Sequence, residues 1–439
     1  MTTEANLPTD DRIMQVLAHL GIERAHFAAR GIPDWRGIVE RHPDAVASLT
    51  LMTPDRIPKD AIEPIAPKVM AVIGDQGPMS LAAQEVMFEV LDASCTTLRG
   101  YEVFPWTDAA KDRHDAVLTS VLGFLERSKE LPDLNVTGQA SGQVAGVSYT
   151  IAGSGPPLVL LPLGLSPSQW EPIMPGLSEH YTTVKLGGAY LGFVATLEDR
   201  GRIPDYVNMF KGLVETVQIQ PGELVLDVGS GSGNLDRWLL RETKGANRII
   251  GADISPYLRG EATALADSEG LGELIEFREG SAEALPHADN TFDVTMSVTA
   301  MEEVDADKMM AEVVRVTKPG GRIAVIVRSV DKPWVIEIPV LDELRAKLES
   351  PGGTVAPKGC ADESLYARFE QAGLSDLQTW LYRVESNATA GPMADNAQNN
   401  MLRKIAPEEG VVFTEAIAKA ASDGTLMYAQ PYHCAVGTV

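Results

Sequence analysis

The chain has few cysteines, no excess of basic residues and no long apolar run, and each shortage excludes a class of protein. Its three cysteines, Cys95, Cys360 and Cys434, lie far apart without a Cys-x-x-Cys pair, so neither a disulfide framework nor a metal site is expected. The 37 basic residues are outnumbered by 61 acidic ones, which gives a net charge of −24 over 439 residues. A nucleic-acid partner is therefore not expected, because a phosphate backbone requires a basic face.

Membrane insertion and export are not expected either. No apolar run approaches the roughly 20 residues that cross a bilayer, and the N-terminal MTTEANLPTDD is polar and acidic, unlike a signal peptide. We therefore expect a cytoplasmic protein without a membrane partner. The hydrophobic content of 44% is that of ordinary globular cores, and the length predicts two or three domains.

The most informative stretch is residues 225–233, which read VLDVGSGSG. Residue types common in strands end in an acid, a Gly-x-Gly-x-Gly turn follows, and residues 234–241 then have a helical apolar pattern. Glycine allows a positive φ or a close approach to a ligand, and a helix start presents free N–H groups to a polar ligand. A dinucleotide-binding turn would read Gly-x-Gly-x-x-Gly, with its third glycine where Asn234 stands. The shorter spacing therefore favours another kind of ligand.

The segments that follow continue a strand–helix alternation. Residues 248–254 (RIIGADI) predict a strand that ends near Asp253, about twenty residues past the glycines, where a Rossmann-like fold places its ribose-binding acid. The remaining segments are, in order, a buried strand over residues 292–298, an amphipathic helix over 305–316, the segment KPGG at 318–321 and a strand over 322–327.

This ordered set resembles the class I S-adenosylmethionine-dependent methyltransferases, especially the branch that acts on small molecules, from about Tyr206 to the C-terminus. The resemblance implies S-adenosylmethionine as the cofactor. In the family an acid is common where this chain has Ser281, and a histidine is common where it has Glu303. The implied contacts are Asp227, Gly229, Ser230, Gly231 and Gly233 for the methionine part, Asp253 for the ribose hydroxyls, Ile254, Ser281 and Ala282 for the adenine, and Ser297 in the loop beside the reactive methyl group.

A general base is needed only if the acceptor is a hydroxyl or amine that must lose a proton. The candidates are Glu302, Glu303, Tyr382 and His433, and each has a structural alternative. The two glutamates stand at a predicted helix start, where they would act as cap or dipole partners. His433, in a predicted last strand, would be a packed or edge histidine. The acceptor pocket is expected from the insertions at residues 333–357 and 387–426.

Residues 1–200 also alternate between helices and strands, which indicates an α/β domain. A linker is predicted near residues 130–141. The predicted helices are 11–22, 81–91 and 108–127, and the predicted strands are 25–29, 46–52, 68–74, 96–104, 158–161 and 182–186.

The part before this linker resembles the C-terminal half of an α/β-hydrolase, and residues 147–186 resemble its N-terminal half, in permuted order. The chemistry of that family is missing. Ala29 stands where the nucleophile belongs, Gly77 where the acid often falls, and no histidine is near Trp106 or Thr107, the approximate place of the base. Without these groups the triad mechanism is not available. Two separate subdomains, or packing of the second part on the methyltransferase, are the alternatives.

The sequence thus predicts an α/β protein with two domains: an inactive hydrolase-like domain over residues 1–200, and a Rossmann-like methyltransferase domain over 203–439. We expect methyl transfer from S-adenosylmethionine to a small-molecule acceptor. The hydrolase-like domain would serve gating or assembly, including a homodimer. The rival hypothesis is a non-catalytic regulator or assembly protein that binds the cofactor.

Overall fold

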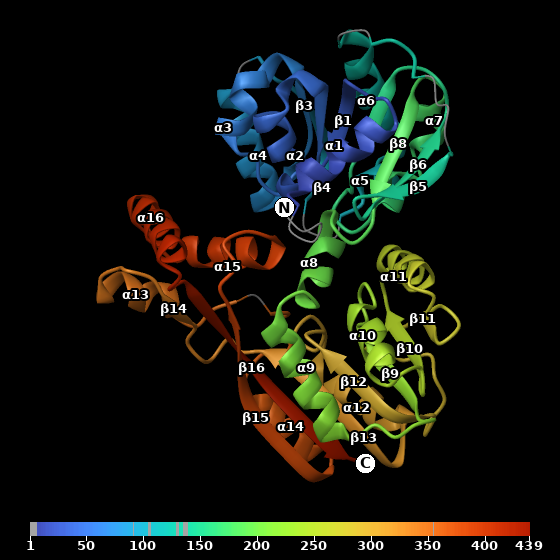
Figure 1. Ribbon diagram of the computed structural model, residues 1–439, viewed down its shortest axis with the longest axis vertical. Helices are drawn as coiled ribbons and strands as arrows, with labels where there is room; N and C mark the ends of the chain where they lie inside the picture. Colours follow the sequence, from blue (N-terminus) through green and yellow to red (C-terminus); the bar gives the residue numbers. More distant parts are fainter. Residues whose placement is uncertain (1–6, 91, 104–106, 129–130, 135–138, 354) are drawn as a thin grey trace. The chain divides into compact units, whose positions relative to one another are not determined.

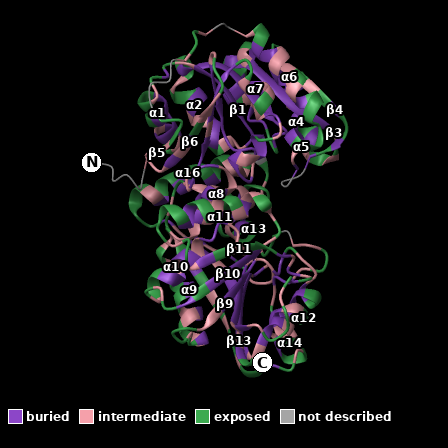
Figure 2. Ribbon diagram, turned by 90° about the vertical axis from the view of Figure 1, so that its right-hand side faces the viewer, coloured by how far each residue is buried: buried purple, intermediate pink, exposed green. Residues whose placement is uncertain are grey.

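The chain divides into two compact units, Met1–Ala195 and Thr196–Val439, in a computed structural model (Figure 1). The structure describes residues 7–90, 92–103, 107–128, 131–134, 139–353 and 355–439. Trp106 and residues 130 and 135–138 of the predicted linker lie outside these ranges. Figure 2 shows that the buried residues gather along the strands of each unit, so each unit has its own core.

The N-terminal unit contains one eight-stranded sheet in the order β4-β3-β2-β1-β7-β8-β6-β5. β6 is antiparallel to both of its neighbours, and the other pairs of neighbours are parallel. The two segments predicted on either side of the linker therefore share a sheet, joined where β1 pairs with β7, and are not separate subdomains. The strands are β1 (Ala25–Ala29), β2 (Val46–Met52), β3 (Val69–Gln76), β4 (Ser94–Glu102), β5 (Ser141–Val144), β6 (Val147–Ala152), β7 (Pro157–Leu160) and β8 (Thr182–Gly187).

Helices cover both faces of this sheet, which is why every residue of β1 and β2 is buried. Residues of α1, α2 and α4 pack on one face, and residues of α6 and α7 pack on the other. The helix predicted over 108–127 is broken at Arg113, whose φ of −134° is not helical. The helices are α1 (Thr9–His19), α2 (Ile32–Arg41), α3 (Lys59–Ile62), α4 (Gly77–Glu89), α5 (Ala109–Asp112), α6 (His114–Arg127), α7 (Met174–Ser178) and α8 (Gly192–Arg200), with short 3-10 turns at Pro43–Ala45, Glu63–Lys68 and Pro167–Trp170.

The C-terminal unit contains a second sheet, in the order β11-β10-β9-β12-β13-β16-β14, with β15 also paired to β16. The first five strands are parallel, and β16 runs antiparallel to β13, β14 and β15. The strands are β9 (Leu224–Val228), β10 (Arg248–Asp253), β11 (Ile275–Glu279), β12 (Phe292–Val298), β13 (Thr317–Arg328), β14 (Val335–Glu337), β15 (Ser375–Ser386) and β16 (Met427–Thr438).

Residues of α9, α10 and α11 cover one face of this sheet, and residues of α12 and α14 cover the other. The inserted elements β14, α13, α15 and α16 share a smaller core of their own. The helices are α9 (Pro204–Val217), α10 (Asn234–Glu242), α11 (Pro256–Ser268), α12 (Ala306–Val316), α13 (Asp342–Glu349), α14 (Ser364–Gln371), α15 (Pro392–Leu402) and α16 (Pro407–Asp423).

The KPGG segment that precedes the predicted strand 322–327 belongs to β13. Thr317 already pairs with Phe292, and a register shift before Val294 absorbs the extra residues. The backbone of Gly320 and Gly321 also bonds to Val439, so the C-terminus extends the ladder. Two glycines are tolerated in this strand because these backbone bonds hold them on both sides.

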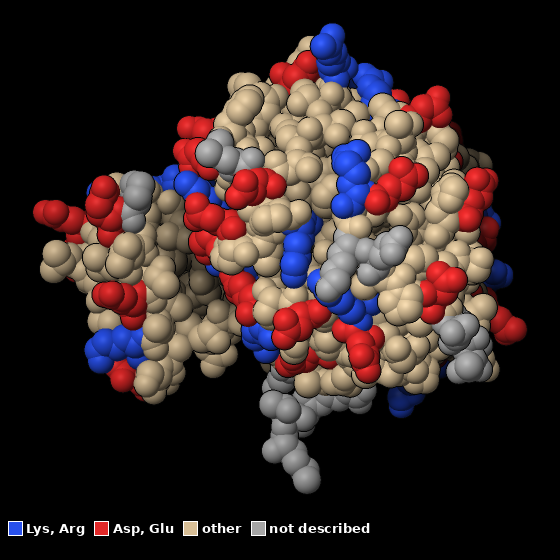
Figure 3. Space-filling view, turned by 90° about the horizontal axis from the view of Figure 1, so that it is seen from above, with Lys and Arg blue, Asp and Glu red and all other residues tan. Residues whose placement is uncertain are grey.

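Two surface properties bear on the partners expected from the sequence. On the face drawn in Figure 3, the Lys and Arg side chains lie interspersed with Asp and Glu side chains. Among the residues that the structure describes, no helix combines the length and the apolar character needed to cross a membrane.

Candidate active site

The glycine turn lies where β9 ends and α10 begins, at the carboxyl edge of the parallel strands. Gly229 has a φ of +80°, and a Cβ there would lie 2.4 Å from the Cβ of Ala300. Gly233 has a φ of +68°, and a Cβ there would lie 2.3 Å from the ring of Phe277. Both positions therefore require glycine for conformation and for space.

Polar groups surround this turn. Asp253, the last residue of β10, accepts a hydrogen bond from the Gly231 backbone N–H at 2.9 Å and another from the Ser255 N–H at 2.8 Å. Burial raises the pKa of Asp253, although these two N–H groups oppose the shift. The buried Ser230 hydroxyl has no hydrogen-bond partner among the described residues. A buried polar atom is usually paired, so the turn has hydrogen-bonding capacity that is left for a ligand.

Two carboxyl groups lie together behind the turn. Asp227, in β9, and Asp236, in the first turn of α10, are both buried. Burial, together with the nearby Asp236, raises the pKa of Asp227 well above its usual range. Burial also raises the pKa of Asp236, to about 7. The pair therefore holds a proton near neutral pH unless a cation is bound beside it.

The other residues predicted for the cofactor follow the ends of neighbouring strands, because β11, β10, β9 and β12 are adjacent in the sheet. Ile254 is 70% exposed, which is unusual for an isoleucine next to a core strand. After β11, the Ser281 hydroxyl accepts a bond from the Glu283 N–H at 3.3 Å, and Ala282 is buried. The buried Ser297 donates its hydroxyl to the Val228 carbonyl at 2.8 Å, so it fastens β12 to β9.

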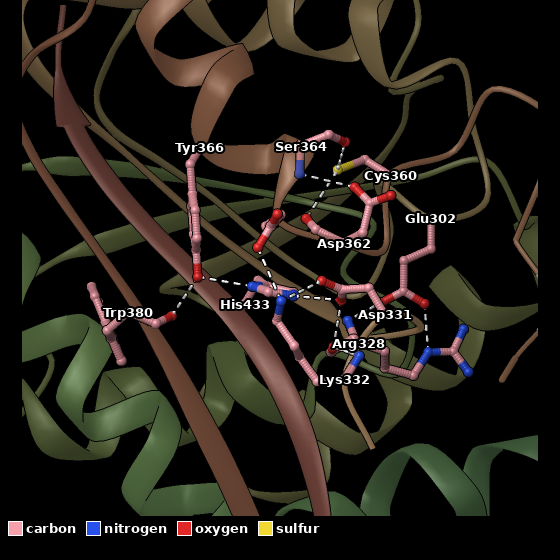
Figure 4. Close-up of polar contacts among 12 residues, drawn as sticks. Glu302, Arg328, Asp331, Lys332, Cys360, Asp362, Ser364, Tyr366, Trp380 and His433 are labelled. Atoms are coloured by element: carbon pink, nitrogen blue, oxygen red, sulfur yellow. Dashed lines mark hydrogen bonds and ion pairs between the residues drawn. The ribbon is translucent and has the colours of Figure 1, made fainter. Parts of the chain in front are cut away.

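The glutamates predicted as base or cap candidates make an ion pair instead. Glu302 is fully buried and accepts hydrogen bonds from the Arg328 backbone N–H and Nε, both at 2.5 Å (Figure 4). Glu303 is exposed and accepts from Arg328 Nη2 at 3.2 Å. The interpretation of these residues as helix-start partners is wrong, because α12 begins later and is capped by the Asp305 side chain.

The last two base candidates are also engaged in internal contacts. His433 is buried between Asp331, at 2.8 Å from Nε2, and the Tyr366 hydroxyl, at 2.8 Å from Nδ1 (Figure 4). Tyr382 donates its hydroxyl to Asp205 at 2.8 Å, and burial together with this acid raises the pKa of Tyr382 to about 12. A phenol with so high a pKa is a poor base at neutral pH.

Sequence reasoning missed two arginines, Arg200 and Arg328, that contact the loop following β12. Arg200, at the end of α8, donates to the Thr299 hydroxyl at 2.9 Å, and Thr299 has a φ of +60°. The only sequence signal for Arg328 is its position at the carboxyl end of a strand. Arg200 has no such signal, because its partner lies far along the chain.

Segments from both predicted insertions approach this loop. The Ala356 N–H donates to the Glu302 carbonyl at 2.8 Å, at the end of the first insertion. In the second insertion, the Met393 N–H at the start of α15 donates to Asp199 at 3.1 Å, next to Arg200. The first insertion therefore contacts the loop after β12 itself, and the second contacts the end of α8, which bonds that loop through Arg200.

Comparison with known proteins identifies this region. Residues 226–325 match the family model described as a methyltransferase domain. The ubiquinone/menaquinone biosynthesis C-methyltransferase UbiE of Legionella pneumophila is 35% identical over 114 residues, which cover 26% of this chain and 46% of that protein. The methyltransferase GfsG of Streptomyces halstedii is 38% identical over 118 residues, 27% of this chain and 42% of that protein. The chain spans less than half the length of both relatives.

Among solved structures, the YcgJ protein of Bacillus subtilis is similar over 53% of this chain and 98% of its own, with 20% identity and a TM-score of 0.36. Geranyl diphosphate C-methyltransferase of Streptomyces coelicolor is similar over 53% of this chain and 79% of its own, with 14% identity and a TM-score of 0.34. The matches in sequence therefore place a methyltransferase domain at residues 226–325, within the C-terminal unit.

Proposed function

We propose that the protein transfers the methyl group of S-adenosylmethionine to a small-molecule acceptor. The observation that carries this proposal is the glycine turn, where an unpartnered buried hydroxyl, Ser230, stands beside the strand-end acid Asp253. An acid and an orphan hydroxyl beside a helix start fit the polar atoms of an amino acid joined to a ribose. The curated relatives with printed functions are methyltransferases, which supports the same reaction.

The residues proposed to hold the cofactor have complementary roles. The acids Asp227 and Asp236 offer negative charge to its ammonium group, and Asp253 accepts from its ribose hydroxyls. The exposed Ile254 offers an apolar surface to the adenine, whose burial would remove an uncovered side chain from water. The remaining residues of this set are Gly229, Gly231 and Gly233 at the turn, Ser230 beside them, Ser281 and Ala282 at the adenine edge, and Ser297 as the support of the loop.

The chain's own contribution to the reaction is positioning. S-adenosylmethionine supplies an electrophilic methyl group when it is bound. The loop over residues 299–303 is fixed by Arg200 and Arg328, so an acceptor resting on it is oriented rather than free to rotate. The segments at Ala356 and at the start of α15 shield the loop from water. No contact described above singles out a general base.

The test is to incubate the protein with S-adenosylmethionine and an extract of small metabolites, and to measure S-adenosylhomocysteine by mass spectrometry. We expect product only when both are present, and cofactor binding by calorimetry without the extract. Binding without turnover in any extract fraction would favour the non-catalytic regulator instead. Absence of binding would contradict both hypotheses.

We also propose that the N-terminal unit is a permuted, inactive α/β-hydrolase-like domain. The sheet order supports this, because the hairpin β5–β6 and the strands β7 and β8 continue into β1 to β4 as the two resembling halves require. Neither Ala29 nor Arg30 has a positive φ, so the strained turn that presents a hydrolase nucleophile is not formed between them. We keep domain limits of 1–200 and 203–439, although the contacts divide the chain within α8, after Ala195.

The buried guanidinium of Arg30 directly follows Ala29, the position where a hydrolase would have its nucleophile. Arg30 is 3% exposed and pairs with Asp55 at 2.7 Å. It also donates to the carbonyl of Thr107, at the approximate place of the missing base, at 3.1 Å, and to the Leu163 carbonyl at 3.4 Å. These contacts support a structural role for this edge of the sheet. We propose that the unit serves substrate gating or assembly, a homodimer included, rather than chemistry.

A further inference from the structure

The loop after β12 contacts two guanidinium groups, those of Arg200 and Arg328. Glu302 neutralises Arg328, but Arg200 has no carboxylate within ion-pair distance among the described residues. Arg200 instead uses Nη1 to bond the neutral Thr299 hydroxyl at 2.9 Å. In a chain with a net charge of −24, a guanidinium left without an acid is informative, because a buried charge is normally paired.

Two donors beside this charge are also unsatisfied. Among the residues that the structure describes, the buried Nε of Arg200 and the buried hydroxyl of Tyr206 have no hydrogen-bond partner. Tyr206 is 0% exposed, and the Arg200 guanidinium carbon lies 5.8 Å from the centre of its ring. Burial raises the pKa of Tyr206, so its hydroxyl keeps its proton and donates. The ring of Tyr432 packs edge-on against the ring of Tyr206, with 5.9 Å between their centres, and the Tyr432 hydroxyl donates to Gln430.

These donors adjoin the cofactor turn. Arg200 bonds Thr299, and the next residue, Ala300, lies so close to Gly229 that a Cβ on the glycine would be 2.4 Å away. Arg200 itself is partly exposed, so a ligand can reach its guanidinium. The guanidinium without an ion-pair partner and the two unmet donors therefore lie beside the loop where the acceptor is expected.

We propose that the methyl acceptor is a carboxylate-bearing small molecule, whose carboxylate binds the guanidinium of Arg200 and the hydroxyl of Tyr206. This inference rests on the proposed function. A planar carboxylate matches the guanidinium fork and accepts a further bond from a phenol. A neutral acceptor would leave the charge and both donors unsatisfied.

The experiment measures binding of paired acids and amides to the full chain saturated with S-adenosylhomocysteine. The probes are benzoate, salicylate, 4-hydroxybenzoate and indole-3-acetate, each compared with its amide by titration calorimetry. We expect at least one acid to bind about tenfold more tightly than its amide, the usual value of one charge-assisted hydrogen bond. Arg200→Gln should abolish this preference, and Tyr206→Phe should weaken the acid several-fold.

Lys211→Gln is the matched control, because Lys211 is an exposed cation on α9 that pairs only loosely with Glu215, at 3.9 Å. The Lys211→Gln variant should prefer the acid over its amide to the same extent as the wild type. The proposal is overturned if no acid is preferred over its amide, if Arg200→Gln keeps the preference, or if Lys211→Gln loses it. S-adenosylhomocysteine binding is measured in the same samples, so that failure of the carboxylate inference can be told from failure of the proposed function. If the wild type does not bind S-adenosylhomocysteine, the proposed function itself is contradicted. Melting curves verify that the variants fold.

Discussion

Asp253→Ala is the sharpest perturbation of the proposed cofactor site. In the structure the carboxylate holds the N–H groups of Gly231 and Ser255, at 2.9 and 2.8 Å, and it is proposed to accept from the ribose as well. Removing a charge-assisted hydrogen bond costs about 1.5–3 kcal/mol. The dissociation constant of S-adenosylmethionine should therefore rise about ten- to hundredfold. Loss of the Gly231 contact acts in the same direction, because it frees the turn.

The assay is titration calorimetry, with Glu279→Ala as the control. Glu279 ends β11 in register with Asp253, yet it is exposed and pairs only with Arg259, at 3.3 Å. An exposed pair of this kind contributes little, so the control should bind the cofactor like the wild type. The reasoning would be refuted by unchanged affinity in Asp253→Ala, or by an equal loss in Glu279→Ala. Thermal melting of each variant verifies that it is folded.

Three further outcomes are expected. Gly229→Ala should weaken cofactor binding at least about tenfold, because the added Cβ meets Ala300 and the φ of Gly229 is positive. Gly260→Ala is the control, because Gly260 has open space around it, and it should bind the cofactor like the wild type. Equal dissociation constants for the two variants, measured by calorimetry, would contradict this. Burial raises the pKa of Asp34 from 3.8 to about 7. The protonated form is thus favoured by folding, and stability is lost as pH rises towards 7, by roughly 3 kcal/mol between pH 5 and pH 8. Urea unfolding of Asp34→Asn should lack this loss. Finally, purified protein should not cleave p-nitrophenyl acetate, and cleavage that depends on residues near Ala29 would disprove an inactive hydrolase domain.

The strands buried on both faces could be predicted from the sequence. The strands Ala25–Ala29, Val46–Met52 and Phe292–Val298 were predicted with the bounds that they have in the structure. Each contains several buried apolar residues, because parallel strands between two helical layers are covered on both faces. The glycine turn and Asp253 could also be predicted from local sequence. Each stands at the end of a strand, and the turn needs glycines that adopt a positive φ.

What could not be predicted depends on partners that are distant in sequence. The helix break at Arg113 and the extension of β13 through KPGG are set by tertiary pairing, against local propensity. Glutamate is common at helix starts, but Glu302 pairs with Arg328, which belongs to the next strand. Arg200 gains its importance from Thr299, almost a hundred residues away. No local pattern encodes such pairs, so the contacts of the loop after β12 could not be predicted from the sequence.

The pairing of β1 with β7 has a consequence for synthesis on the ribosome. β1 to β4 emerge first and can form a half-sheet, but the remaining edge of β1 stays unpaired until residues 157–160 are translated. Every residue of β1 is buried in the finished unit, so a nascent chain at that stage exposes an apolar strand edge. Chains stalled shortly before β7 should therefore recruit chaperones and aggregate, whereas chains stalled after β8 should resist protease.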